Sequence, residues 1–175
     1  MENCKILALS PPASFLNVFI RDRIVALIKP YLCQMSKGNI LMHTAAAPAG
    51  HALRILAVDD NREAALSIKD AVEDFGDTAF VCFKGHEALE LAGSIRPDVI
   101  LLDLSMPDID GVDVARILRA DPRLAGVKII ALTAYGDAEA RQKTAAAGFD
   151  LHLTKPVRFE VLADMLDLLR LAPKR

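Results

Sequence analysis

The chain has 175 residues, of which 53% are hydrophobic and 25% are charged, and its formal net charge is −2. This composition excludes wholesale disorder and predicts one ordinary folded domain with some chain left over. The slight excess of acid argues against binding to nucleic acid.

The cysteines and the apolar segments bear on where the protein works. Cys4, Cys33 and Cys82 are scattered, without the spacing of a zinc site, so we expect free thiols in a reducing compartment. No apolar stretch is long enough to span a bilayer. Prolines at 11–12 and charges at 21–23 interrupt the N-terminal apolar segment, which argues against a secretory signal. We therefore expect a cytoplasmic protein that does not bind membranes.

Residues 1–52 form an N-terminal extension and linker, with five basic and two acidic residues. Residues 15–32 are rich in large apolar side chains and predict a short amphipathic helix, and the small residues at 44–50 indicate a linker. Three interpretations remain open. The helix docks on a partner or on the protein itself, it anchors at a membrane surface, or translation starts at Met35 or Met42. We favour the third.

From residue 53 onward, short apolar runs alternate with amphipathic helical segments. The predicted strands are 53–58, 78–83, 99–102, 127–132 and 151–153. The predicted helices are 61–75, 85–95, 111–120, 137–147 and 157–171. Five strand–helix units in strict alternation predict an α/β domain over residues 53–172, with a parallel sheet and helices on both faces.

Polar residues follow four of these strands where each strand ends. Asp59 and Asp60 follow the first strand, and Asp103 follows the third. Thr133 follows the fourth strand and Lys155 follows the fifth. The carboxyl ends of parallel strands share one edge of the sheet, where ligands bind in such folds. We therefore expect three carboxylates, a hydroxyl and an ammonium group to meet at this edge.

Each of these residues also has an ordinary structural interpretation. Asp60, with Glu63 three residues later, could be the cap of the first helix. Asp103 could simply enter a turn, and Thr133 could cap the fourth helix. Lys155 could be a solvated lysine before a proline. Taken singly these alternatives are strong, but four strand ends with complementary groups favour a site.

The chemistry of the set explains why these groups would belong together. Clustered carboxylates repel one another unless a cation is present, and a few oxygen ligands suit Mg²⁺, which also binds phosphate. A carboxylate can attack phosphorus and form an aspartyl-phosphate. A metal, a lysine and a hydroxyl are the groups that stabilise a transferring phosphoryl group.

Several motifs now fall into one pattern: Asp59-Asp60, Asp103 with Met106-Pro107 and Asp110-Gly111, Thr133-Ala134, and Lys155-Pro156. Thr133 follows Asp103 by 30 positions and Lys155 follows it by 52. In these motifs and spacings the chain resembles, over residues 53–171, the receiver domain of two-component response regulators. The resemblance implies a flavodoxin-like, doubly wound sheet of five parallel strands in the order 2-1-3-4-5.

The resemblance also implies roles for the acidic residues and the loop after the third strand. Asp103 is the phosphoacceptor and a ligand of Mg²⁺. Asp59 and Asp60 hold the metal, and Asp60 is the favoured direct ligand. The main-chain carbonyl of Ser105 completes the protein's share of the metal shell.

The remaining site residues take their roles from the resemblance in the same way. Lys155 pairs with the phosphoryl oxygens, and the bond before Pro156 is cis. Thr133 is the switch hydroxyl that moves to meet the phosphate. The second switch position, usually aromatic in the family, is His152, which could make switching pH-sensitive or be only a polar ring on a short strand.

Tyr135 lies two residues after Thr133, at a position that influences access to the phosphoryl group. Together with Ser105 it should tune the lifetime of the phosphoryl group.

The sequence therefore predicts a stand-alone receiver in two-component phosphorelay signalling. A histidine kinase or a histidine phosphotransfer protein phosphorylates Asp103, and the switch alters a surface read by another, unnamed protein. We expect no enzyme activity beyond self-phosphorylation and autodephosphorylation. The alternative is an interaction module with the same fold that does not use phosphorylation, and a phosphate-ester hydrolase ranks lower.

Overall fold

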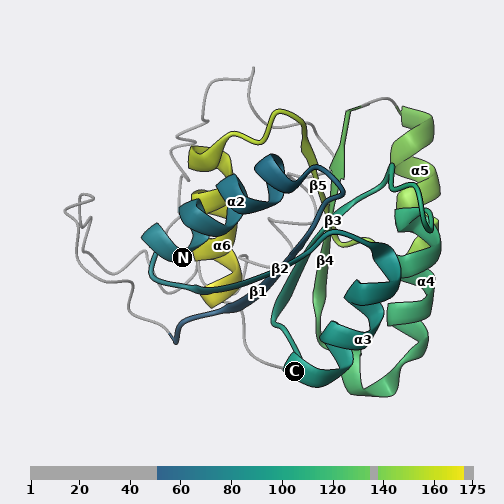
Figure 1. Ribbon diagram of the computed structural model, residues 1–175, viewed down its shortest axis with the longest axis horizontal. Coiled ribbons are helices and arrows are strands. Elements are labelled where there is room, and N and C mark those ends of the chain that lie inside the picture. The colour runs from purple at the N-terminus through teal and green to yellow at the C-terminus, as the bar shows by residue number, and fades with distance from the viewer. Residues whose placement is uncertain (1–50, 135–137, 172–175) are drawn as a thin grey trace, which may run out of the picture. The chain divides into compact units, whose positions relative to one another are not determined.

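The computed structural model describes residues 51–134 and 138–171 (Figure 1). Within these residues, five strands form one parallel sheet in the order β2-β1-β3-β4-β5. The strands are β1 (Arg54–Val58), β2 (Thr78–Cys82), β3 (Val99–Asp103), β4 (Lys128–Thr133) and β5 (Leu151–Thr154). The predicted flavodoxin-like order is confirmed, and each strand end lies within about one or two residues of its predicted position.

Helices connect the strands in the predicted alternation. They are α2 (Arg62–Asp74), α3 (Gly85–Ile95), α4 (Gly111–Ala120), α5 (Ala138–Ala147) and α6 (Phe159–Leu171). A short 3₁₀ helix, η1 (Pro122–Leu124), lies between α4 and β4. The last helix begins at Phe159 rather than at the predicted residue 157, because the chain bends at Lys155 and Pro156 and the next two residues are not yet helical.

Helices cover the sheet on both faces, as predicted. Figure 1 shows α2 and α6 on one side of the strands, and α3, α4 and α5 on the other. All five residues of β3 are buried because the central strand is covered from both sides. The apolar core therefore holds β3 rigidly and fixes the position of the carboxylate at its end.

Short polar residues begin two helices near the strand ends. The side chain of Asn61 accepts hydrogen bonds from the amides of Glu63 and Ala64, and so caps α2. The interpretation of Asp60 as this cap is therefore wrong, because the chain uses the next residue. Asp110 caps α4 by accepting from the amide of Val112 at 2.7 Å.

A buried ion pair lies where strands β1 and β2 begin. The guanidinium of Arg170, in α6, contacts both carboxylate oxygens of Asp77, which precedes β2. Asp77 also accepts a hydrogen bond of 2.9 Å from the amide of Leu53, just before β1. This contact joins the last helix to the first two strands, far from the polar strand ends.

Some of the predictions lie outside the described residues. They are the extension up to residue 50 with its helix at 15–32, the alternative starts Met35 and Met42, Cys4 and Cys33, Tyr135, and the domain end at residue 172. Cys82 is a buried thiol at the end of β2, and burial raises its pKa to about 12.

Across residues 51–134 and 138–171, every helix is too short or too polar to cross a membrane.

Candidate functional site

The polar strand ends meet at one edge of the sheet, as the topology requires. Leu102 pairs in register with Val58 of β1 and Ala131 of β4, so the residues that follow these three lie side by side. Asp59 and Asp103 are therefore neighbours, with exposed fractions of 0% and 4%. Asp60, the next residue, is exposed, and one of its carboxylate oxygens lies within 4.8 Å of oxygens of Asp59 and Asp103.

Lys155 reaches this edge from the end of β5. Its Nζ lies 2.7 Å from Oδ2 of Asp59 and 3.0 Å from Oδ2 of Asp103. The interpretation of Lys155 as a merely solvated lysine is therefore wrong. Burial acts to lower the pKa of Lys155, but the two carboxylates outweigh burial and raise the pKa above its usual 10.5. Lys155 is thus an ammonium group at neutral pH and offsets one of the negative charges.

The two buried carboxylates receive few hydrogen bonds. Oδ1 of Asp59 accepts from the amide of Asn61 at 3.0 Å, and Oδ1 of Asp103 accepts from the amide of Ser105 at 3.3 Å. Oδ2 of Asp59 accepts no hydrogen bond within the described part of the chain. The Lys155 ammonium lies 2.7 Å from it as an ion-pair partner. This oxygen therefore has an ion-pair partner and keeps lone pairs that a further cation can use.

The acidic residues fit a divalent metal ion. Asp59, Asp60 and Asp103 each offer one oxygen, and these oxygens lie within 4.8 Å of one another. Three carboxylates and one ammonium leave the cluster with a net negative charge. A bound cation would relieve the repulsion between the carboxylates. Oxygen-only ligands in small number match Mg²⁺. The residues present thus fit the metal that the sequence predicts.

A tight loop follows β3 and folds back on the strand end. The amide of Gly111 donates to the carbonyl of Leu104 at 3.0 Å, which closes the loop that contains Ser105. A Cβ at Gly111 would lie 2.2 Å from the carbonyl oxygen of Asp103, so any side chain there would collide with the backbone. Glycine is therefore required for α4 to begin so close to Asp103.

The other side of the edge comes from β4 and β5. Thr133, at the end of β4, is 6% exposed, and its carbonyl accepts from the amide of Lys155 at 2.8 Å. The peptide bond between Lys155 and Pro156 is cis. His152 is half-buried on β5, and its Nε2 lies 3.0 Å from the hydroxyl of Thr144 in α5. The ring of His152 is thus in contact with α5.

Comparison with known proteins identifies the family. The sequence profile of the response regulator receiver domain matches residues 55–167. The chain belongs to this family. Chemotaxis protein CheY4 of Vibrio cholerae has a solved structure that superposes with a TM-score of 0.65 and 28% identity, over 68% of this chain and 99% of that one. The Francisella response regulator 1452 receiver domain superposes with a TM-score of 0.62 and 32% identity, over 67% of this chain and 96% of that one.

Curated relatives of this chain are longer proteins that it matches over part of their length. The signal transduction histidine-protein kinase BarA of Escherichia coli K12 is 34% identical over 115 residues, which are 66% of this chain and 12% of that protein. Response regulator MprA of Mycobacterium ulcerans is 40% identical over 119 residues, 67% of this chain and 50% of that protein. The chain therefore spans half or less of the length of these relatives, and membership assigns it to two-component signalling.

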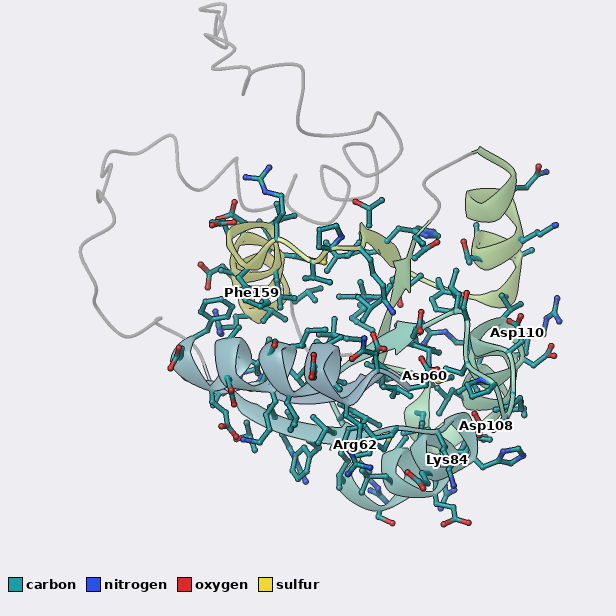
Figure 2. The ribbon with its side chains drawn as sticks, turned by 45° about the horizontal axis from the view of Figure 1, so that its top comes forward. Asp60, Arg62, Lys84, Asp108, Asp110 and Phe159 are labelled. Atoms are coloured by element: carbon teal, nitrogen blue, oxygen red, sulfur yellow. The ribbon has the colours of Figure 1, made fainter. Side chains whose placement is uncertain are left out.

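The sequence pattern missed one residue of this receiver domain's loop. Asp108 lies between β3 and α4, and its carboxylate accepts hydrogen bonds from the amides of Gly85 and His86 at the start of α3. The partners lie 23 and 22 positions away in the chain, so local spacing carries no signal of the contact. Figure 2 shows Asp108 at the same end of the molecule as Asp60 and Lys84.

Proposed function

We propose that this receiver domain accepts a phosphoryl group on Asp103 from a histidine kinase or a histidine phosphotransfer protein. The observation that carries the proposal is the position of the Lys155 ammonium, 3.0 Å from Asp103 and 2.7 Å from Asp59, beside a cluster of three carboxylates. Family membership supports the same role. The phosphoryl group would then control a surface that another protein reads.

The transfer follows from the chemistry of the residues. A carboxylate oxygen of Asp103 attacks the phosphorus of the donor's phosphohistidine, the new P–O bond forms, and the P–N bond breaks to release the imidazole. Lys155 balances the charge on the phosphoryl oxygens, and its net raised pKa keeps it protonated for this task. The amide of Ser105 already donates to Oδ1 of Asp103 and orients the nucleophile.

We propose that Asp59, Asp60, Asp103 and the carbonyl of Ser105 hold Mg²⁺. When bound, the ion would neutralise the carboxylates and the incoming phosphoryl oxygens, as in other phosphoryl transfers. The convergence of one oxygen from each of the three aspartates, within 4.8 Å of one another, supports this proposal. The protein's share is to keep the oxygens converged before the ion arrives.

We propose that Thr133 and His152 transmit the change. A phosphoryl group at Asp103 offers oxygens that the hydroxyl of Thr133 can approach from the neighbouring strand end. The ring of His152, which contacts Thr144 of α5, would then move with it. The surface formed by α5, β5 and α6 would differ between the two states and so alter partner binding.

Catalysis by the domain is limited to its own phosphorylation and dephosphorylation, and a cytoplasmic location stays a prediction from the sequence. A phosphorylation-independent interaction module would be favoured by a Lys155 turned away from Asp103, and here the two groups are an ion pair.

The test is phosphorylation by a small acyl-phosphate donor with Mg²⁺, followed by intact mass measurement. The wild-type chain should gain one phosphoryl group, and Asp103→Asn should gain none. Asp110→Asn is the matched control because it changes a carboxylate of the same loop that only caps α4. Labelling of Asp103→Asn to the wild-type extent would refute the assignment of Asp103.

A further inference from the structure

The loop of residues 104–110 is attached to α3 through the side chain of Asp108. Oδ1 accepts from the amide of Gly85 at 3.1 Å, and Oδ2 accepts from the amide of His86, also at 3.1 Å. The ring Nδ1 of His86 lies 3.0 Å from the same Oδ2. Lys84, the residue at the cap position of α3, makes no side-chain capping bond. Asp108 therefore caps this helix from a different loop.

A second contact fastens the same loop to the same helix. A Cβ at Gly85 would lie 2.2 Å from Cγ2 of Ile109 and 2.8 Å from Cγ2 of Val114. Glycine at the first position of α3 thus leaves the space that Ile109 fills. Polar and apolar contacts together fix the loop against the start of α3.

The loop so held is the one that leads out of the candidate metal site. At its beginning, the amide of Ser105 donates to Asp103, and at its end the amide of Gly111 donates to the carbonyl of Leu104. These bonds fix the two ends of the loop but leave its middle dependent on other contacts. Asp108 makes the polar contacts of that middle part with α3.

The charge state of Asp108 suits this role. Partial burial acts to raise the pKa of its carboxyl group, but hydrogen bonds from the amides of Gly85, His86 and Ile109 and from the His86 ring outweigh burial. The pKa is therefore held well below its usual range, and Asp108 accepts hydrogen bonds as a carboxylate across the physiological pH range.

We propose that Asp108 is a positioning residue for the metal site, which acts by holding the loop so that the main-chain carbonyl of Ser105 faces the carboxylates. The inference rests on the proposed function, because it assigns Asp108 to the Mg²⁺ site described there. Residues that orient metal ligands commonly change metal affinity about 10- to 100-fold when they are removed. Loss of Asp108 should therefore weaken Mg²⁺ binding although the side chain is not itself a ligand.

The test is a Mg²⁺ titration of the full chain, in which the shifts of the amide NMR signals of Asp103 and Gly111 report binding. Asp108→Ala should raise the dissociation constant about tenfold. Asp108→Asn keeps one carboxamide oxygen for the helix amides and should fall between Asp108→Ala and the wild type. His86→Ala leaves both amide contacts of Asp108 in place and should bind Mg²⁺ like the wild type.

Asp121→Ala is the matched control, because Asp121 caps η1 by accepting from the amide of Arg123 at 2.9 Å, at the far end of α4. Both alanine variants lose an aspartate cap and should lose similar stability, but only Asp108→Ala should lose Mg²⁺ affinity. Equal Mg²⁺ affinity of the Asp108 variants and the wild type overturns the inference and leaves the proposed function standing. A wild-type chain that binds no Mg²⁺ overturns both.

Discussion

Lys155 supplies the positive charge beside the carboxylates of the site, and its removal should lower the stability of the fold. We predict that Lys155→Met lowers the free energy of unfolding by about 1–2 kcal/mol at neutral pH without divalent cations, because Asp59 and Asp103 lose their charge partner. The pKa of Lys155 is raised on folding above its usual 10.5. The extra free energy of unfolding of the wild type over Lys155→Met is therefore fully present below pH 10.5 and declines as the pH rises above it.

Urea unfolding of both chains across a pH series measures the difference. The comparison with Lys155→Met isolates this one group, because all other lysines and tyrosines titrate in both proteins. An advantage that is absent at neutral pH, or that persists undiminished far above pH 10.5, would contradict the assigned charge pairing.

At the scale of single elements, the start of α4 depends on a glycine that touches the backbone of β3. We predict that Gly111→Ala destabilises the fold by about 1–3 kcal/mol, because its Cβ would meet the carbonyl oxygen of Asp103 at 2.2 Å and backbone cannot yield easily. Thermal and urea unfolding measure the loss, and the variant should also be phosphorylated more slowly.

Gly93→Ala is the matched control within α3. Its new Cβ would lie 3.5 Å from the flexible end of Arg123, an ordinary contact, and alanine favours a helix over glycine by about 0.5–1 kcal/mol. The control should therefore stabilise the protein. Equal changes in the free energy of unfolding for the two substitutions would show that the backbone of Asp103 leaves room for a side chain at position 111.

At the scale of the whole molecule, the pair of Arg170 and Asp77 joins the last helix to the first strands. Both side chains are buried, at 5% and 0% exposure, so Arg170→Met leaves a buried carboxylate without its cation. We predict a loss of about 3–5 kcal/mol in the free energy of unfolding, measured in urea. Arg116→Ala, which breaks an exposed pair with Asp113, should cost less than about 0.5 kcal/mol, and similar losses for both would refute the structural role.

The sequence predicts most of this architecture because local signals and topology agree. Strict alternation of apolar runs and helical stripes predicts a parallel sheet, and parallel strands bring Asp59, Asp103 and Lys155 to one edge. Their pairing follows from charge. The order of the strands does not follow from alternation and came only from the resemblance to a known family.

Contacts between distant segments could not be predicted in this way. Asp108 caps a helix that begins 23 positions earlier, and Arg170 pairs with a carboxylate 93 positions away. Asn61 caps α2 in place of Asp60, since adjacent residues can both serve as caps and backbone geometry decides between them. Such choices depend on the packed structure rather than on spacing.

The central claim is that Asp103 is the residue that carries the phosphoryl group. Borohydride reduces an acyl phosphate to an alcohol, so a phosphorylated aspartate becomes homoserine and can be located by peptide mass spectrometry. After treatment with a small phosphodonor and Mg²⁺, we predict homoserine at position 103 in the wild-type chain, and none when Mg²⁺ is chelated. Homoserine at position 59 or 60, or at no position, would contradict the account.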